Sequence, residues 1–333
     1  MKNLTTNALK ALLTVAAFSF MLFFAQTAKA QTKELTHDFA EFAALNVTED
    51  FEVTLAKGNP GIKLTVDTQL APYVNTYVKG NTLFLSYDEK AVPKDVKKLY
   101  KGKNAPVPIM RAVVYTPVLE TITLANNTSL TGTEEFNCKH FELNLGDKAN
   151  VKQLNVFCST AKISMKKNSE AVLNINSESS VDVELNNNAN LKLTATVNEL
   201  NVTTLGSASA FINGDAISLK VDAQGKTETT AVFENPTESV VAVLVENAAV
   251  TLTGNAGTLV LNASKNSVAD FSGLAVVDSA EVTMNSGKAT ISPAAALKVN
   301  LISGATLYFN GTPSIQVDKI IKSTLAPSGT PLK

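Results

Sequence analysis

The sequence contains no tryptophan, one arginine, two histidines and two cysteines among its 333 residues. Two cysteines and two histidines cannot supply a four-ligand zinc site within the repeats described below. The formal net charge is −1 at pH 7, and a near-neutral chain is a poor partner for nucleic acid. With 45 % hydrophobic and 18 % charged residues, the chain has the composition of a folded protein with a substantial core. These scarcities argue against catalysis, and we expect no metal or other cofactor.

The first 30 residues have the pattern of a secretory signal peptide. Lys2 and Lys10 precede or border an uncharged stretch over 11–25, and Ala28 and Ala30 are the small residues that a signal peptidase accepts. The apolar stretch is about 15 residues long, short of the roughly 20 that span a bilayer, and a single-pass anchor is the alternative. Cleavage would leave 26 basic and 30 acidic residues, a net charge of −4. We expect an exported protein without a transmembrane segment, located in the periplasm, at the outer membrane or on the cell surface.

Residues 31–117 contain short stretches of alternating apolar and polar residues, separated by glycine- and asparagine-rich turns. In one stretch Phe51, Val53 and Leu55 share a face, which is typical of a strand. A short helical turn is expected over 70–74. The six lysines and three acids of residues 88–103 indicate a solvated loop or short exposed helix, and a contact patch for anionic polymers is the alternative. This part of the chain is predicted to be a β-rich cap.

Residues 118–320 carry an internal repeat of about 20 residues. In each repeat, two apolar residues are separated by one residue, and a second such pair often follows. The first pairs along the chain are Ile122/Leu124, Leu143/Leu145, Ile163/Met165, Val183/Leu185, Thr203/Leu205, Leu219/Val221, Val243/Val245, Leu259/Leu261, Val282/Met284 and Val299/Leu301. Propeller blades need about 40 residues, and leucine-rich or helical repeat patterns are absent.

The predicted fold class is therefore all-β: a right-handed parallel β-helix, or β-solenoid, with the N-terminal cap described above. About ten coils would each contribute two or three short strands, and stacking at about 4.8 Å would give an elongated molecule. Residues 321–333 are expected to form a loose tail. The 24 asparagines between residues 118 and 320 fit turns in which asparagine adopts left-handed backbone angles and bonds the next coil. A polar face for glycans is the alternative explanation for these asparagines.

The two cysteines are one repeat apart. Cys138 and Cys158 each lie seven residues before the second apolar residue of their coil, so the register places them side by side on adjacent coils. In-register neighbours in a parallel sheet are close enough for a disulfide, and an exported protein can retain one. A stacked pair of free, buried thiols is an equally good interpretation.

Several motifs between residues 39 and 87 resemble the opening of a known family. They are Phe39-Ala40-Glu41-Phe42, Phe51-Glu52-Val53-Thr54-Leu55, Ile62-Lys63-Leu64-Thr65-Val66-Asp67, Leu70-Ala71-Pro72-Tyr73-Val74 and Val78-Lys79-Gly80-Asn81-Thr82-Leu83. They are similar to strand and turn motifs of the bacterial family called "putative auto-transporter adhesin, head GIN domain" (DUF2807), whose function is unknown. The resemblance covers most of the mature chain. It implies β-helical coils and a role in adhesion or at the cell envelope, and it brings no catalytic residue.

A glycan-active enzyme is the competing hypothesis, because parallel β-helices also host polysaccharide lyases and glycoside hydrolases. Asp182 and Glu184 are the nearest pair of candidate carboxylates, but with Lys162 they fit a solvated outer face better. The single arginine, Arg111, precedes the regular coils and is expected to be an exposed strand residue or part of an ion pair. A Cys138–His140 nucleophilic pair is geometrically feasible but unnecessary, because coil stacking already explains the cysteine.

A carbohydrate or protein ligand is the expected partner, although the absence of tryptophan weakens the case for a sugar site. Tyrosine is the remaining aromatic with a polar end, and five of the six tyrosines lie between residues 73 and 115. The candidate ligand surface consists of Tyr73, Tyr77, Tyr87 and Tyr100. We therefore predict a non-catalytic exported protein that presents a long surface for adhesion or for interaction with the cell envelope, and a carbohydrate-binding module is a further alternative.

Overall fold

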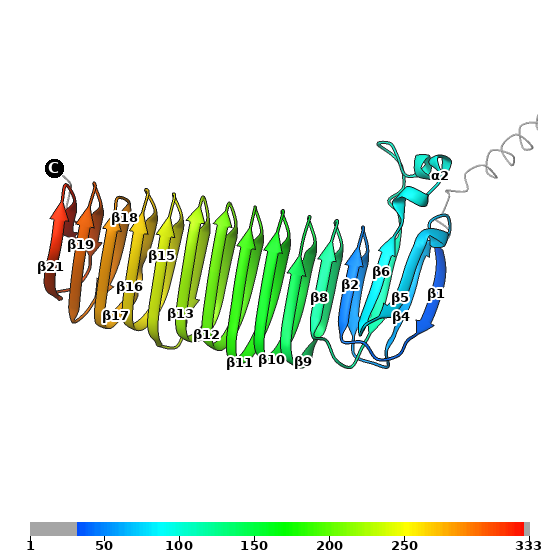
Figure 1. The fold of residues 1–333 in the computed structure, drawn as a ribbon, viewed down its shortest axis with the longest axis horizontal. Coiled ribbons are helices and arrows are strands. Elements are labelled where there is room, and N and C mark those ends of the chain that lie inside the picture. Colours follow the sequence, from blue (N-terminus) through cyan, green and yellow to red (C-terminus); the bar gives the residue numbers. More distant parts are fainter. Residues whose placement is uncertain (1–31, 330–333) are drawn as a thin grey trace, which may run out of the picture.

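The computed structural model describes residues 32–329, which form a β-solenoid of about ten stacked parallel turns (Figure 1). The predicted all-β solenoid is confirmed. The predicted signal peptide, residues 1–30, lies outside the described residues. Among the helices of residues 32–329, none combines the length and hydropathy needed to cross a bilayer.

The stacked coils are built from long strands that continue around a corner of the solenoid. The strands are β8 (Thr121–Ala125), β9 (Ser129–Leu145), β10 (Asn150–Lys166), β11 (Glu170–Asn186), β12 (Asn190–Gly206), β13 (Ser209–Gly225), β14 (Glu228–Phe233), β15 (Thr237–Val245), β16 (Ala249–Ser264), β17 (Val268–Asn285), β18 (Lys288–Pro293), β19 (Ala296–Ile302) and β20 (Thr306–Phe309). Five successive strands, β9 to β13, have 17 residues each, where two or three short strands were expected. The chain bends at irregular points of the ladder without leaving it.

The parallel register follows the predicted repeat and corrects its phase at two coils. Leu145 pairs with Met165 and Met165 with Leu185, but Leu185 pairs with Thr204. The predicted inward pair Thr203/Leu205 is therefore wrong by one residue, and Val202 and Thr204 are the buried pair.

The predicted pair Val243/Val245 is wrong in the same way, because Ala242 and Leu244 are buried instead. Residues 240–245 are apolar on both faces, so a period of two does not reveal which face points inward.

The corners of the solenoid are tight turns in which two consecutive residues have positive φ. At successive coils these residues include Asn126 with Asn127 and Asn187 with Asn188. The Asn188 amide donates to Oδ1 of Asn168, one coil earlier, at 3.0 Å. Backbone groups of the turns also bond across coils, as when the amide of Asn168 donates to the carbonyl of Asn187 at 3.2 Å. The structural explanation of the asparagines therefore holds at these turns.

The N-terminal part combines antiparallel strands with the first coil of the stack. Its strands are β1 (Thr32–Asp38), β2 (Ala44–Thr48), β3 (Glu52–Ala56), β4 (Gly61–Asp67), β5 (Val74–Lys79), β6 (Thr82–Tyr87) and β7 (Met110–Tyr115). Antiparallel pairing joins β1 to β4, β4 to β7 and β5 to β6. Strands β2 and β3 instead pair in parallel with β8 and β9, so they already belong to the coil stack.

Three short helical segments interrupt this N-terminal part. They are η1 (Ala71–Tyr73), η2 (Glu89–Ala91) and α2 (Lys94–Leu99). The first confirms the helical turn expected over 70–74, and α2 confirms a short helix within residues 88–103. No residue of α2 is buried, and the helix stands beyond the strand ends at the cap end of the molecule (Figure 1).

The C-terminal end continues the stack further than expected. Strand β21 (Ser314–Ile321) pairs in parallel with β19, and β22 (Thr324–Pro327) pairs in parallel with β20. Residues 324–327 are therefore part of the solenoid, and the prediction of a loose tail from residue 321 is wrong for them. Every residue of β21 is exposed, because no further coil among the described residues covers it.

Candidate functional site

A cavity of about 500 Å³ lies between the first coils and the helical excursion of the cap. One wall comes from the turn and strand at Asp50, Phe51 and Glu52, continued on the next coil by Asn127 and Ser129. The opposite wall is formed by the segment that includes α2 and the loop leading to β7: Glu89, Lys97, Tyr100, Lys101, Val107 and Pro108. Residues more than 70 positions apart thus meet because the coils stack and the excursion folds back over them.

Two of the four predicted tyrosines line this cavity. Tyr87, at the end of β6, and Tyr100, which caps α2, both contribute to its wall. Tyr73 packs partly buried against the hydrophobic core. Tyr77 stays outside the cavity, 48 % exposed, and stacks on Phe84 with ring centroids 5.1 Å apart. The predicted tyrosine surface therefore divides into one pair at the cavity and two residues elsewhere.

Burial and neighbouring carboxyl groups keep both cavity tyrosines neutral. Burial raises the pKa of Tyr100 well above its usual value, and a hydrogen bond to the Asp67 side chain adds to the effect. Asp67 is itself only 4 % exposed. The pKa of Tyr87 is also raised, first by burial and then by the charges of Glu89 and Asp50. The tyrosine hydroxyls remain hydrogen-bonding groups throughout the physiological pH range.

The charged groups around the cavity are of both signs and several are held in place. The Asn127 amide donates to Oδ1 of Asp50 at 3.0 Å. Glu52 pairs with Arg111 at 3.1 Å, so the single arginine takes part in the local ion pair considered from the sequence. Glu89, Lys97 and Lys101 add one negative and two positive groups to the wall. The cavity thus combines fixed polar groups, two aromatic rings and apolar contacts at Leu70, Val107 and Met110.

Replacing Tyr100 by phenylalanine is expected to change how stability depends on pH. The folded-state pKa of Tyr100 is raised above the unfolded value of about 10, so the stabilising contribution is complete below pH 10 and falls as the pH rises beyond it. At pH 7, Tyr100→Phe loses the hydrogen bond to Asp67 and about 1 kcal/mol of stability.

We expect the difference in urea midpoint between Tyr100→Phe and the unsubstituted chain to shrink from pH 9 to pH 11. A difference that stays constant over this range would show that the hydroxyl makes no hydrogen bond of consequence.

The two cysteines lie on adjacent coils, as the repeat predicts. Cys158 pairs with Cys138 in the parallel register, and both are free thiols in the structure. Burial, with the neighbouring Cys158, raises the pKa of Cys138 to about 12, and burial also raises the pKa of Cys158. Thiolate is therefore scarce at neutral pH, which disfavours a nucleophilic role. The disulfide stays a prediction, tested by counting reactive thiols in the denatured, unreduced protein.

The candidate carboxylate pair lies on an open face of the coils. Asp182 and Glu184 line a shallow depression of about 300 Å³ together with Lys162 and Asn201. The Asn201 amide donates to Asp182 at 2.9 Å, and the Asn186 amide donates to Glu184 at 2.9 Å.

His140 lies in an adjoining depression, where Nδ1 is 2.8 Å from the Thr160 hydroxyl. No aromatic side chain of a sugar platform lines the Asp182 depression. Within residues 32–329, no group of three or more histidine, cysteine, aspartate or glutamate side chains is arranged to hold a metal ion.

Several cavity residues were not predicted from the sequence. Asp50, Lys97 and Asn127 belong to three separate turns or helices, and only the stacking of the coils brings them together. The local signals were present in the positive-φ turn at Asp50 and in the lysine-rich excursion, but each also fits an ordinary solvated segment.

Comparison with known proteins identifies the same family that the sequence motifs resemble. The family described as "Putative auto-transporter adhesin, head GIN domain" matches residues 41–178, which include the cavity and the first coils. This confirms the resemblance over a shorter segment than the mature chain. No curated protein matches the chain.

Solved structures cover nearly the whole chain at low similarity. A "putative adhesin" from Bacteroides fragilis is 14 % identical, covers 89 % of this chain and 97 % of its own, and has a TM-score of 0.39. A "putative adhesin" from Parabacteroides distasonis is 18 % identical, covers 90 % and 98 %, and has a TM-score of 0.35. A "putative lipid binding protein" from the same species is 13 % identical, covers 90 % and 97 %, and also has a TM-score of 0.35.

Proposed function

Because residues 41–178 carry the head GIN domain, we propose that the chain is an exported, non-catalytic adhesion protein that binds its ligand in the cap cavity. The observation that supports this most directly is the meeting of Tyr87 and Tyr100 in one cavity with fixed polar groups. The signal-peptide pattern of residues 1–30 supports export. The long stack of coils would carry the cavity away from the other end of the molecule.

The ligand class best suited to this cavity is a short neutral oligosaccharide. Its volume of about 500 Å³ is within the range of small-molecule sites. Tyrosine rings offer apolar faces for sugar rings, while their hydroxyls and the neighbouring carboxylates and asparagine bond hydroxyl groups. Three acidic and two basic side chains line the wall, and this near balance favours an uncharged ligand over a strongly charged polymer.

Binding to a glycan and matrix-protein array should reveal a ligand whose affinity depends on the cavity tyrosines. We expect Tyr87→Ala and Tyr100→Ala to weaken binding at least about tenfold, because each removes a ring from the wall. Glu89→Gln should weaken it to a lesser degree and changes an exposed group, so folding is preserved.

Tyr77→Ala is the matched control, since Tyr77 lies outside the cavity and its loss should leave binding unchanged. The proposal fails if the array detects no ligand for the folded mature chain. It also fails if Tyr77→Ala reduces binding as much as Tyr100→Ala.

The glycan-active enzyme remains the second hypothesis, and the exposed pair Asp182 and Glu184 is its candidate site. Both carboxylates accept hydrogen bonds from asparagine amides on an open strand face, an arrangement that favours a solvated surface over an acid and a base. Incubation with acidic and neutral polysaccharides, monitored for new reducing ends and unsaturated uronates, distinguishes the two functions. Turnover that is lost in Asp182→Asn or Glu184→Gln would favour the enzyme.

A further inference from the structure

The C-terminal end of the solenoid exposes the side chains that would otherwise form its core. Leu297, Val299 and Leu301 of β19 are at most 1 % exposed. Their register partners on the last coil are Ile315, Val317 and Ile320. Residues paired in a parallel ladder point to the same face, so these three side chains continue the inward columns. They are nevertheless 39 %, 51 % and 38 % exposed.

The backbone of this last coil is also unsatisfied along one edge. Within residues 32–329, β21 pairs only with β19, and β22 pairs only with β20. The outer edges of both strands therefore present free amide and carbonyl groups beside the apolar columns. Solenoids generally need a polar terminal coil, because an open end of this kind is a template for further strand pairing.

The opposite end of the molecule has no such surface. Strand β1 is exposed at six of its seven positions, and its exposed residues include Lys33, Glu34, His37 and Asp38. Antiparallel strands cover the coils there, and the chain reverses direction instead of ending in an open coil. A head-to-tail stack would place the apolar columns against this polar strand. The C-terminal end is thus matched poorly by the other end of the same molecule.

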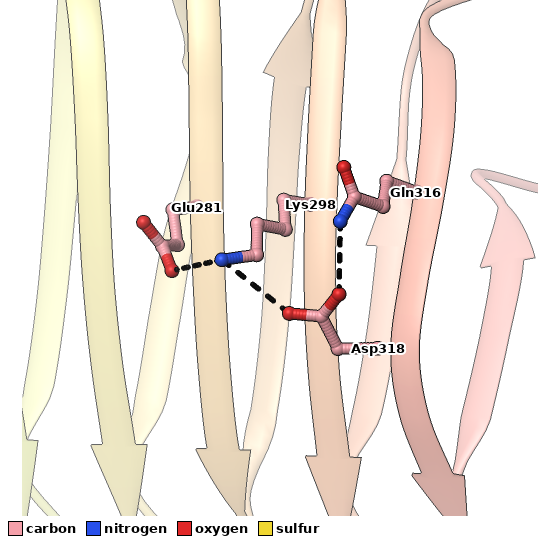
Figure 2. A network of polar contacts seen from close by, with 4 residues as sticks. All are labelled: Glu281, Lys298, Gln316 and Asp318. Carbon is pink, nitrogen blue, oxygen red and sulfur yellow. Dashed lines mark hydrogen bonds and ion pairs between the residues drawn. The ribbon is translucent and has the colours of Figure 1, made fainter.

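An irregularity in β21 makes its outer edge complementary to itself. The register shifts between Val299 and Asn300, so Asp318 is an extra residue between Val317, which pairs with Val299, and Lys319, which pairs with Asn300. Asp318 lies toward the outer face, where Figure 2 shows it beside Lys298. Lys298 bridges Asp318 at 3.4 Å and Glu281 at 3.1 Å, and the Gln316 amide donates to Asp318 at 3.0 Å.

The order along the strand is therefore Val317 inward, Asp318 and Lys319 outward, and Ile320 inward. A twofold axis between Asp318 and Lys319 would bring β21 antiparallel to its copy. Asp318 would then face Lys319 of the second copy, and Val317 would face Ile320. Inward residues meet inward residues, and opposite charges meet on the outer face. In residues 32–329 Lys319 has no ion-pair partner, so it is available for this contact.

We propose that the C-terminal coil is a self-association surface, through which two copies of the chain pair β21 with β21 about a twofold axis. The contact joins the two apolar cores and satisfies the free edge of each β21. The two cap cavities then lie at the far ends of one elongated dimer. This inference rests on the C-terminal coil alone and does not depend on the ligand proposed for the cap.

Sedimentation equilibrium of the mature chain should show a reversible monomer–dimer equilibrium with no larger species. Val317→Asp should abolish dimerisation, because it places a charge in the joined core. Val277→Asp is the matched control, since Val277 is 56 % exposed and lies on a strand away from the end. It should leave the dimer intact. Circular dichroism verifies that both variants keep their strands.

Charge reversal tests the predicted register. Lys319→Asp creates two like-charge contacts per dimer and should raise the dimer dissociation constant about tenfold or more. Mixing that variant with a second chain carrying Asp318→Lys should restore association, because both facing pairs then have opposite charges. The proposal is overturned if the unsubstituted chain stays monomeric at all concentrations or forms open-ended polymers. Dimers that persist in Val317→Asp, or mixing that fails to restore association, would also overturn it.

Discussion

Gly214→Ala is expected to lower the free energy of unfolding by about 3–5 kcal/mol, the larger of two effects predicted for single substitutions. Gly214 lies in β13 with a φ of +130°, a conformation that side chains with a β-carbon rarely adopt. A β-carbon there would lie 2.0 Å from the carbonyl oxygen of Ala195 and 2.9 Å from its carbonyl carbon. Ala195 is the register partner of Gly214 on the preceding coil, so only separation of the two coils relieves the clash.

Gly304→Ala provides the control for this substitution. Gly304 also has a positive φ, +83°, but a β-carbon there would have no atom within 4 Å. Its cost should be the backbone strain alone, about 1–2 kcal/mol. Urea midpoints measured at equal transition slopes compare the two variants. Equal losses would mean that Gly214 is needed for its backbone angle and that the contact with Ala195 plays no part.

Phe271→Ala is expected to remove about 3–5 kcal/mol and to act mainly on the C-terminal coils. Phe271 lies in β17, is fully buried, and pairs with Ile291 of β18 in the register. Truncation leaves a cavity between coils that have no neighbours other than those before and after them. Hydrogen exchange should therefore lose protection from β17 to β22 before the strands near the cap change.

Phe211→Ala tests whether burial causes the effect. Phe211 lies in β13 with its side chain 49 % exposed, so its removal uncovers little core. Its expected cost is below about 1 kcal/mol, with protection unchanged along the stack. If both substitutions open the same C-terminal segment to the same extent, the weakness of that segment does not depend on the buried ring.

The coil architecture could be predicted because a parallel solenoid repeats its pattern at a nearly constant interval. Pairs such as Leu143 with Leu145 and Ile163 with Met165 recur 20 residues apart, and each coil sits in register on the last. The phase failed at Val243 and Val245, where apolar residues occupy both faces. At Thr204 it failed because a threonine is buried, and its hydroxyl lies 3.4 Å from that of Thr229.

The cap cavity could be predicted only in part. Tyrosine-rich composition pointed to the correct region, but it contains no information on where each ring points. Tyr77 stacks on Phe84, whereas Tyr100 reaches a cavity through the fold of the excursion and its contact with Asp67. Such contacts depend on the path of a non-repeating segment, and no periodicity of the sequence encodes that path.

Positive-φ turns stacked at each corner make molecular length adjustable in steps. Each coil closes with its own turn and bonds mainly to the coil on either side, as Asn188 does to Asn168. Insertion or loss of one unit of 19 to 21 residues in the regular region would change the reach of the molecule by about 4.8 Å. The wall of the cap cavity, which extends no further than Ser129, would be untouched. Homologous chains could thus differ in reach while sharing one binding chemistry.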